Sequence, residues 1–461
     1  MCQNDAVELA SSTLGRMDRV CVTAESSAFR AIQTPLESQM NNFVKRYALV
    51  SCWYVISVFL LHGSAFAQSE SDSTDWAQWR GPSRDGKVDA APWPDTLSKD
   101  RFIQNWRTAL GPSYSGPLVV GDSVYITETV NEKDEVVRCL DRNTAAQKWE
   151  VNWTGSMKVP FFASSNGSWI RSTPACADGK LYVGGIRDML VCIDASTGKI
   201  LWQKDFPTIN NTPIPMFGCV CSPLVDGDAV YMQAGGAMHK LNKDTGAPIW
   251  QSASDGPGNN SSVFSSPVIE SIAGERQMLI QGRDNLLGVD LQTGRVLWNQ
   301  PTPAFRGMSI VTPTVFNDML FNSNYQHPTT MVSIRKTSQQ SYQLSEKWKN
   351  KARGYMTTPV IIEGHAYTFL QNQRFACVEL ETGAVKWSSE KFAKYASLIA
   401  NGNRILALTA DGDLILYAAN PERFEMIDRR NVAADSWAHL AVSGNEVFVR
   451  TIDGLLSFSW Q

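Results

Sequence analysis

The chain carries a recurring pattern of short strand-like apolar runs separated by polar turns. Residues 192–202 show it most fully, because an apolar run ends at Asp194, Ser-Thr-Gly follows, and a second run ends at Trp202. An Asp side chain accepts hydrogen bonds from backbone amides two residues on, and Gly198 tolerates the left-handed conformation that closes such a turn. The pattern predicts a β-hairpin whose second strand presents an indole at a fixed distance from the turn.

This hairpin pattern recurs with constant spacing. In five copies a tryptophan follows the polar turn residue by eight positions: Asp141 and Trp149, Asp194 and Trp202, Asn242 and Trp250, Asp290 and Trp298, Glu379 and Trp387. Four of the turns contain a glycine, namely Gly198, Gly246, Gly294 and Gly383. Self-similarity with a period of roughly 40–50 residues is typical of propellers and solenoids. Because periodicity accounts for these tryptophans, we expect them in the core.

Each hairpin is preceded by two further strand-like runs, so a unit supplies four strands. Six units open on a small residue and a proline, at Gly116-Pro117, Thr173-Pro174, Ser222-Pro223, Ser266-Pro267, Thr312-Pro313 and Thr358-Pro359. Proline is tolerated at the first residue of a strand because its missing N–H falls at the end of the ladder. Two more units, which begin near Ser397 and Ala438, lack the proline.

The eighth unit reaches Gln461 with only three strands. A fourth is available in residues 102–110, which contain the repeat-type Trp106 but belong to no unit of their own. Pairing the two would close a circle and leave no large sheet edge exposed. The sequence therefore predicts an all-β fold over residues 101–461, an eight-bladed β-propeller of four-stranded antiparallel blades. Seven blades is the alternative, because the unit at 396–429 lacks the tryptophan.

Three segments precede the predicted propeller. Residues 40–67 combine a basic start, an apolar run and Ala65-Phe66-Ala67, which predicts a signal peptide cleaved after Ala67 and a periplasmic or secreted protein. An uncleaved anchor is the alternative, although the run is short for a membrane span of about 20 residues. Residues 1–39 are interpreted as an extension or a mis-called start, and 68–100 as a linker. In that linker Trp76, Trp79 and Arg80 either cap the channel or pin the N-terminus, and pinning is favoured.

Composition excludes some functions. With 461 residues, 19% charged side chains and a net charge of −3, the chain offers no electrostatic case for binding nucleic acid. Six cysteines follow Ala67, and their pairing is left open. Neither a zinc-type spacing nor a Gly-x-Ser-x-Gly nucleophile elbow occurs. We therefore assign no catalytic residue, metal ligand or cofactor, and expect a monomer without a membrane span after cleavage.

The repeats resemble those of the PQQ-like β-propeller superfamily. Residues 194–202 are close to its tryptophan-docking motif, and residues 79–82, Trp-Arg-Gly-Pro, resemble a secreted bacterial branch. The superfamily contains quinoprotein dehydrogenases, which bind pyrroloquinoline quinone and calcium, and cofactor-free relatives such as BamB, a scaffold in outer-membrane protein assembly. Quinoprotein alcohol dehydrogenases carry two adjacent cysteines, whereas one residue separates Cys219 from Cys221. The resemblance implies a non-catalytic binding scaffold of the cell envelope; a quinoprotein-type oxidoreductase or another funnel-site enzyme is the alternative.

Candidate binding residues precede the inner strands, because the connectors that enter these strands cross one face of a propeller. Arginine and aromatic residues, which anchor interfaces and anionic ligands, stand there: Trp169, Arg171, Phe217, Arg306, Arg353, Tyr355, Trp437 and His439. We expect Arg171, Arg306, Arg353, Tyr355 and Trp437 to act together at one mouth of the channel. Their guanidinium groups would favour a carboxylate or an acidic peptide of an envelope partner. The alternative is a structural ring in which the arginines pair with carboxylates or carbonyls.

Overall fold

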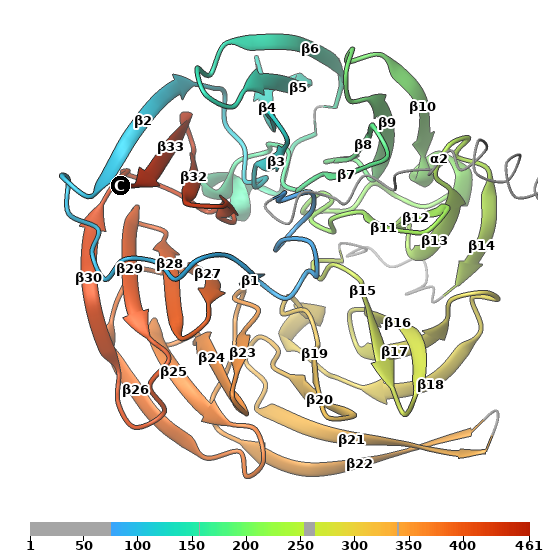
Figure 1. The fold of residues 1–461 in the computed structure, drawn as a ribbon. Coiled ribbons are helices and arrows are strands. Elements are labelled where there is room, and N and C mark those ends of the chain that lie inside the picture. The colour runs from blue at the N-terminus through green and yellow to red at the C-terminus, as the bar shows by residue number, and fades with distance from the viewer. Residues whose placement is uncertain (1–74, 156, 253–262, 339–340) are drawn as a thin grey trace, which may run out of the picture. The chain divides into compact units, whose positions relative to one another are not determined.

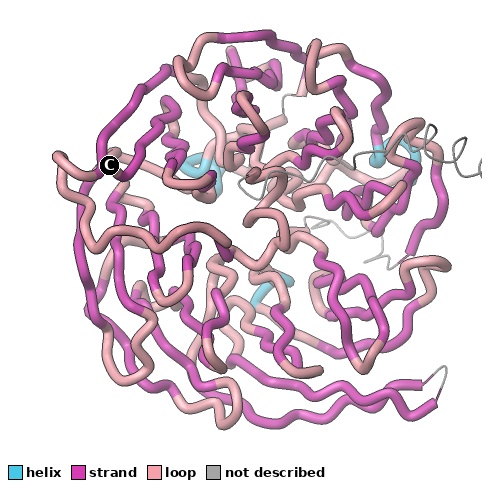
Figure 2. The backbone as a smooth tube through the Cα atoms, in the orientation of Figure 1, coloured by secondary structure: helices cyan, strands magenta, loops and turns pink. Residues whose placement is uncertain are grey.

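Eight four-stranded antiparallel sheets stand around a common centre (Figures 1 and 2). This arrangement is seen in a computed structural model that describes residues 75–461 except 156, 253–262 and 339–340. It confirms the predicted eight-bladed β-propeller. The predicted signal peptide and the extension at 1–39 lie outside the described residues.

The blades follow one another along the chain, and in blades 1 to 7 the inner of the four strands comes first. Blade 1 contains β3 (Leu118–Val120), β4 (Ser123–Val130), β5 (Asp134–Asp141) and β6 (Gln147–Thr154). Blade 2 contains β7 (Ala175–Ala177), β8 (Lys180–Gly185), β9 (Met189–Asp194) and β10 (Ile200–Asp205). Blade 3 contains β11 (Leu224–Asp226), β12 (Ala229–Ala234), β13 (Ala237–Asn242) and β14 (Pro248–Ser252). Blade 4 contains β15 (Val268–Ile272), β16 (Glu275–Gln281), β17 (Asn285–Asp290) and β18 (Val296–Pro301).

The remaining blades repeat this order. Blade 5 contains β19 (Thr314–Phe316), β20 (Met319–Asn322), β21 (Thr329–Ser338) and β22 (Ser341–Asn350). Blade 6 contains β23 (Val360–Ile362), β24 (His365–Phe369), β25 (Arg374–Glu379) and β26 (Val385–Lys391). Blade 7 contains β27 (Ala396–Asn401), β28 (Arg404–Thr409), β29 (Asp413–Ala418) and β30 (Glu425–Asn431), and β1 (Lys87–Val88) adds to its inner edge. Short helices interrupt three connectors: η1 (Phe161–Asn166), α2 (Phe206–Asn210) and η2 (Phe305–Gly307).

Blade 8 closes the circle with strands from both ends of the propeller. It contains β31 (Ala441–Ser443), β32 (Glu446–Thr451), β33 (Gly454–Trp460) and, as its outer strand, β2 (Phe102–Ala109). β2 pairs antiparallel with β33 from Phe102 opposite Trp460 to Ala109 opposite Gly454. The predicted closure is therefore confirmed.

The Thr-Gly turns form as expected and also hold neighbouring blades together. Asp194 Oδ1 accepts hydrogen bonds from the backbone amides of Ser196 at 3.0 Å and Thr197 at 2.9 Å. Trp149 of the preceding blade donates from Nε1 to Ala195 O at 3.0 Å and lies over Gly198. A Cβ atom on that glycine would stand 2.7 Å from the indole, so the position needs glycine for space as well as for its φ of 76°. The same donation to the next blade comes from Trp106, Trp202, Trp250 and Trp387.

Blade 5 departs from the repeat because its outer hairpin is long. Trp298 donates to Gln277 Oε1 of its own blade at 2.7 Å instead of reaching the next blade. Trp348, on β22, takes the interblade contact and donates to Leu380 O at 2.7 Å. The sequence pattern missed Trp348 because the β21–β22 hairpin carries no Thr-Gly turn eight residues before it.

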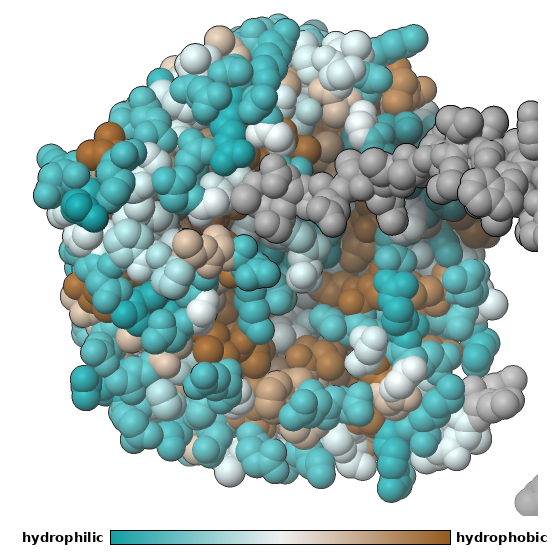
Figure 3. Space-filling model, in the orientation of Figure 1, coloured by the Kyte–Doolittle hydropathy of each residue, from teal (hydrophilic) through white to brown (hydrophobic). Residues whose placement is uncertain are grey.

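Apolar side chains fill the space between blades, and Figure 3 shows hydrophilic side chains prevailing at the perimeter of one face. Cys139, Cys192 and Cys377 are buried among them, as small apolar side chains in strands. The six cysteines of the described part form no disulfide there. In the same residues, no helix is long and apolar enough to cross a membrane.

Candidate functional site

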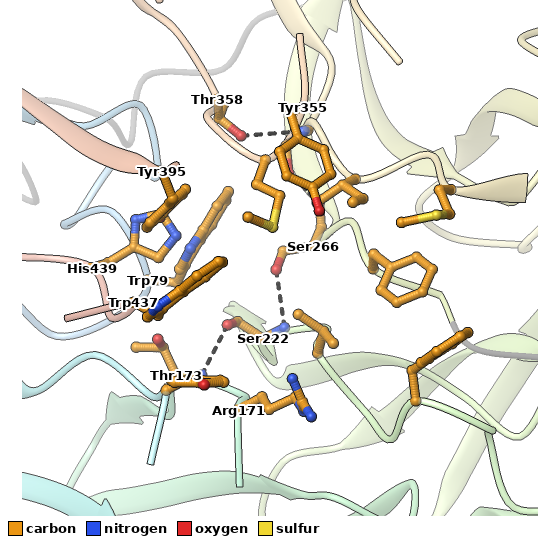
Figure 4. A pocket seen from close by; sticks show the side chains of 18 of the residues that line it. Trp79, Arg171, Thr173, Ser222, Ser266, Tyr355, Thr358, Tyr395, Trp437 and His439 are labelled. Atoms are coloured by element: carbon orange, nitrogen blue, oxygen red, sulfur yellow. Dashed lines mark hydrogen bonds between the residues drawn. The ribbon is translucent and has the colours of Figure 1, made fainter. Parts of the chain in front are cut away.

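The connectors that lead into the eight inner strands surround a central cavity of about 240 Å³ (Figure 4). Every connector supplies at least one lining residue; one from each is Tyr114, Arg171, Phe217, Phe264, Met308, Tyr355, Tyr395 and Trp437. Closure of the propeller thus brings together eight segments that are far apart in the sequence.

A chain of hydroxyl groups joins the inner strands beside this cavity. In several blades, the hydroxyl group of the Ser or Thr just before the proline accepts a hydrogen bond. The donor is the backbone amide of the residue at the same position in the preceding blade. Gly116 N donates to Thr173 Oγ1 at 2.9 Å, Thr173 N to Ser222 Oγ at 3.1 Å, Ser222 N to Ser266 Oγ at 3.0 Å, and Thr312 N to Thr358 Oγ1 at 3.1 Å. Proline holds the residue before it in an extended conformation, which repeats the geometry from blade to blade. The recurring Ser/Thr-Pro pair was a signal for these residues that the sequence analysis left unused.

One end of the cavity is formed by the N-terminal segment, defined here as residues 75–88. The segment crosses the centre of the ring in Figure 1. Trp76 forms a bridge with Val119 of blade 1, and Ala77 O accepts a hydrogen bond from Cys176 N of blade 2 at 2.7 Å. Gly86 O accepts one from Ala400 N of blade 7 at 2.8 Å, where β1 runs parallel to β27. These backbone contacts hold the segment against the inner strands of blades 1, 2 and 7. Its Trp79 lines the cavity.

Two buried arginines of this segment bind carbonyl groups that directly precede the inner strands of blades 6 and 3. Arg80 donates to Pro359 O at 2.7 Å, and Arg84 donates to Pro223 O at 2.8 Å and to Ser222 O at 3.2 Å. Both guanidinium groups lie over the Trp79 ring, at 5.6 Å and 5.2 Å from its centroid. Burial lowers the pKa of Arg80 to about 10 and that of Arg84 to about 9, so both remain charged at neutral pH. Two positive charges therefore lie beside the indole that lines the cavity.

The wall of the cavity adds one more cation. Arg171 lines it, donates to Gly167 O at 2.7 Å and lies 5.4 Å from the centre of the Tyr114 ring. Burial lowers the pKa of Arg171, and burial together with the nearby Arg80 lowers that of His439 to about 3, which leaves this imidazole neutral. No Asp or Glu occurs among the described residues that line the cavity. The described lining therefore carries one guanidinium group and no carboxylate, while Asp85 acts on Arg80 and Asp435 acts on Tyr114 from outside the lining.

The structure brings together only part of the set proposed from the sequence. Arg171, Phe217, Tyr355, Trp437 and His439 line the cavity. Trp169 instead packs edge-on against the Tyr114 ring at 6.1 Å, with its own ring outside the lining.

Arg306 and Arg353 do not line the cavity, which corrects the expectation that they join Arg171 there. Arg306 is exposed in η2, over the ring of Phe305, and Arg353 is exposed beside a separate hollow with Gln371. Arg306 precedes β19 by eight residues and Arg353 precedes β23 by seven, but Phe217 also precedes its inner strand β11 by seven and lines the cavity, so position along the connector does not decide which side chains enter it. The three guanidinium groups near the cavity are Arg171, Arg80 and Arg84. The sequence analysis gave Arg80 only a pinning role and did not single out Arg84.

The residues present do not suit the calcium of the quinoprotein dehydrogenases. Calcium is bound by six to eight oxygen ligands, mainly carboxylates and carbonyls, and the described lining has no carboxylate. No group of three or more His, Cys, Asp or Glu that could hold a metal occurs in the described parts of the chain. Of Cys219, Val220 and Cys221, only the valine lines the cavity, while burial raises the pKa of both thiols.

Comparisons with known proteins place this propeller among relatives. A sequence model of the family described as "Outer membrane protein assembly factor BamB" matches residues 133–389, more than half of the chain. BamB of Yersinia pestis is 22% identical over 351 residues, which cover 72% of this chain and 79% of that protein. The crystal structure of BamB from Moraxella catarrhalis superposes with a TM-score of 0.56 at 17% identity, over 78% of this chain and 100% of that one. A quinohemoprotein alcohol dehydrogenase from Comamonas testosteroni shares the fold, with a TM-score of 0.50 and 13% identity over 86% of this chain and 82% of that one.

Proposed function

The chain belongs to the family described as outer membrane protein assembly factor BamB, and from this premise we propose that it is a non-catalytic scaffold of the cell envelope. It would bind a protein partner on the face where the connectors surround the cavity. The names of its relatives suggest a partner that takes part in outer-membrane protein assembly. A periplasmic location after cleavage at Ala67 is part of the same proposal.

The observation that carries this proposal is a row of aromatic side chains leading from the surface into the cavity. Phe161 and Phe162 are 89% and 60% exposed and lie 5.7 Å apart, centre to centre. Phe162 lies 6.2 Å from Phe217, which lies 6.0 Å from Phe264, and the last two line the cavity. We call these four residues the aromatic rim. Adjacent exposed aromatic residues mark interaction surfaces, because burying them against a partner removes a large apolar area from water.

The chemistry of the lining supports binding more than catalysis. It offers aromatic rings, hydroxyl groups and one guanidinium, which suit recognition. A general base works best with a pKa near the operating pH, and the pKa of about 3 makes His439 a weak base.

Site-directed photo-crosslinking tests the proposal. A photoreactive amino acid replacing Phe162 should crosslink the exported protein to an envelope protein in living cells, and Phe161→Ser should weaken that product. The control is the same group replacing Ile249, which is 51% exposed on β14. Equal crosslinking at both positions would count against a binding face here. Stoichiometric uptake of pyrroloquinoline quinone and calcium, with dye-linked alcohol oxidation, would replace the proposal by the enzymatic alternative.

A further inference from the structure

The size of the central cavity points to a single aromatic group as its occupant. At about 240 Å³ it is smaller than the pockets of about 300–1,000 Å³ that enclose drug-sized ligands. It is larger than the cavity of about 150 Å³ that suffices for benzene in another protein. One phenyl or indole group is therefore the matching size.

The lining has the surfaces that such a ring prefers. Figure 4 shows Trp79, Trp437 and Tyr395 on one side of the cavity and Tyr355 on another. Tyr395 and Trp437 are stacked, with centroids 5.7 Å apart and planes 8° apart. Aromatic pairs gain energy beyond their buried area, and the flexible side chains of Met308 and Met356 adapt to the shape of an entering group.

The charge of the site selects an acidic neighbour for that ring. Arg171 lines the cavity, while Arg80 and Arg84 lie over Trp79. The carboxyl of Asp435 is not part of the lining, but it is hydrogen-bonded to the side chain of Trp437, which is. The guanidinium group of Arg171 is the charged group of the described lining that an entering carboxylate would meet in this partly enclosed space. A guanidinium group binds a carboxylate through paired hydrogen bonds.

The aromatic rim identifies the source of the ligand. Its rings continue from the cavity to the exposed Phe161, so the apolar surface extends beyond the volume that one ring fills. A free small acid would leave that surface uncovered, whereas an extended polypeptide would cover it. We infer that the cavity binds an aromatic side chain of an extended segment in the partner protein, with an adjacent acidic side chain of that segment paired with Arg171. This inference rests on the proposed scaffold function and specifies how the same face recognises its partner.

Capped pentapeptides provide the probe, detected on the whole exported protein by saturation-transfer NMR and calorimetry. Gly-Phe-Glu-Gly-Gly should bind. Its Phe→Ala version should bind at least tenfold more weakly because it loses the apolar area that the ring buries, and its Glu→Gln version should do so because it loses a hydrogen bond between charged groups. Arg171→Gln should weaken the Phe-Glu peptide by a similar factor and remove its preference over the Phe-Gln peptide. Arg353→Gln is the matched control, because the same change is made at an exposed arginine outside the cavity.

A second variant keeps the test independent of Arg171. Val220→Phe places extra volume in the cavity and should abolish peptide binding, whereas Val385→Phe, at an exposed position of β26, should not. Unchanged binding in Val220→Phe would overturn the inference. So would equal affinity for the free acid 3-phenylpropionate, which would assign the site to a small molecule. Crosslinking at Phe162 without peptide binding would leave the scaffold function standing and remove only this inference.

Discussion

At the scale of single residues, two buried carboxyl groups connect neighbouring blades. Glu135 of blade 1 accepts hydrogen bonds from Trp153 Nε1 at 2.7 Å and from Ile186 N of blade 2 at 2.6 Å. Asp188 of blade 2 accepts one from Gly235 N of blade 3 at 2.7 Å. Burial raises the pKa of each carboxyl to about 7, despite these hydrogen bonds.

These two groups contribute stability that is lost as the pH rises from about 4 to about 7. In the unfolded chain both carboxyls titrate near pH 4, so across this window these two groups bind more protons in the native state than in the unfolded state, and their contribution to stability decreases with pH. Burial lowers the pKa of His239 to about 4 and that of His439 to about 3, so these two groups contribute in the opposite direction over the same window. Asp188→Asn should remove part of this loss, so that between pH 4.5 and pH 7.5 its thermal midpoint falls less, or rises more, than that of the wild type. Asp228→Asn, where the carboxylate is 98% exposed, should retain the wild-type pH dependence. The attribution is wrong if both variants behave alike.

At the scale of the element, the N-terminal segment is held by side chains that reach several blades. Arg84→Ala would leave the carbonyls of Ser222 and Pro223 without their guanidinium donor, at a cost of roughly 1–3 kcal/mol for each buried group. We expect faster hydrogen exchange at Cys176 N and Ala400 N, which donate to the segment. Lys87→Ala, an exposed change in the same segment, should leave this exchange unchanged. Wild-type exchange in Arg84→Ala would mean that the strand contacts alone hold the segment.

At the scale of the whole molecule, β2 completes the ring. A chain that begins at residue 111 would lack β2 and expose the full edge of β33, which pairs with it over Phe102–Ala109. Unpaired strand edges associate with other chains, so light scattering should show oligomers or aggregates. The control is a chain that begins at residue 91, which loses the N-terminal segment but keeps β2, and it should stay monomeric. A monomeric chain from residue 111 would contradict a closing role for β2.

What the sequence by itself determined was the repeating architecture. The hydrogen bonds of a turn such as Asp194 with Ser196 and Thr197 span only three residues, so the local pattern specifies the hairpin. Because the eighth unit lacks one strand and the strand around Trp106 belongs to no unit, the sequence also predicted that these two parts pair and close the ring. Where the local pattern failed, at the long β21–β22 hairpin, Trp348 went unrecognised.

Only the tertiary structure decided which side chains meet at the cavity. Arg80 and its acceptor Pro359 are 279 residues apart, and Arg84 and Pro223 are 139 apart, so no local spacing relates them. Distance from the inner strand also failed as a guide, because Arg353 and Phe217 both precede their inner strands by seven residues, yet Arg353 is exposed and Phe217 lines the cavity. Arg80 and Arg84 lie near the cavity because the N-terminal segment crosses the centre of the ring. The position of that segment depends on packing and hydrogen bonds between distant parts of the chain.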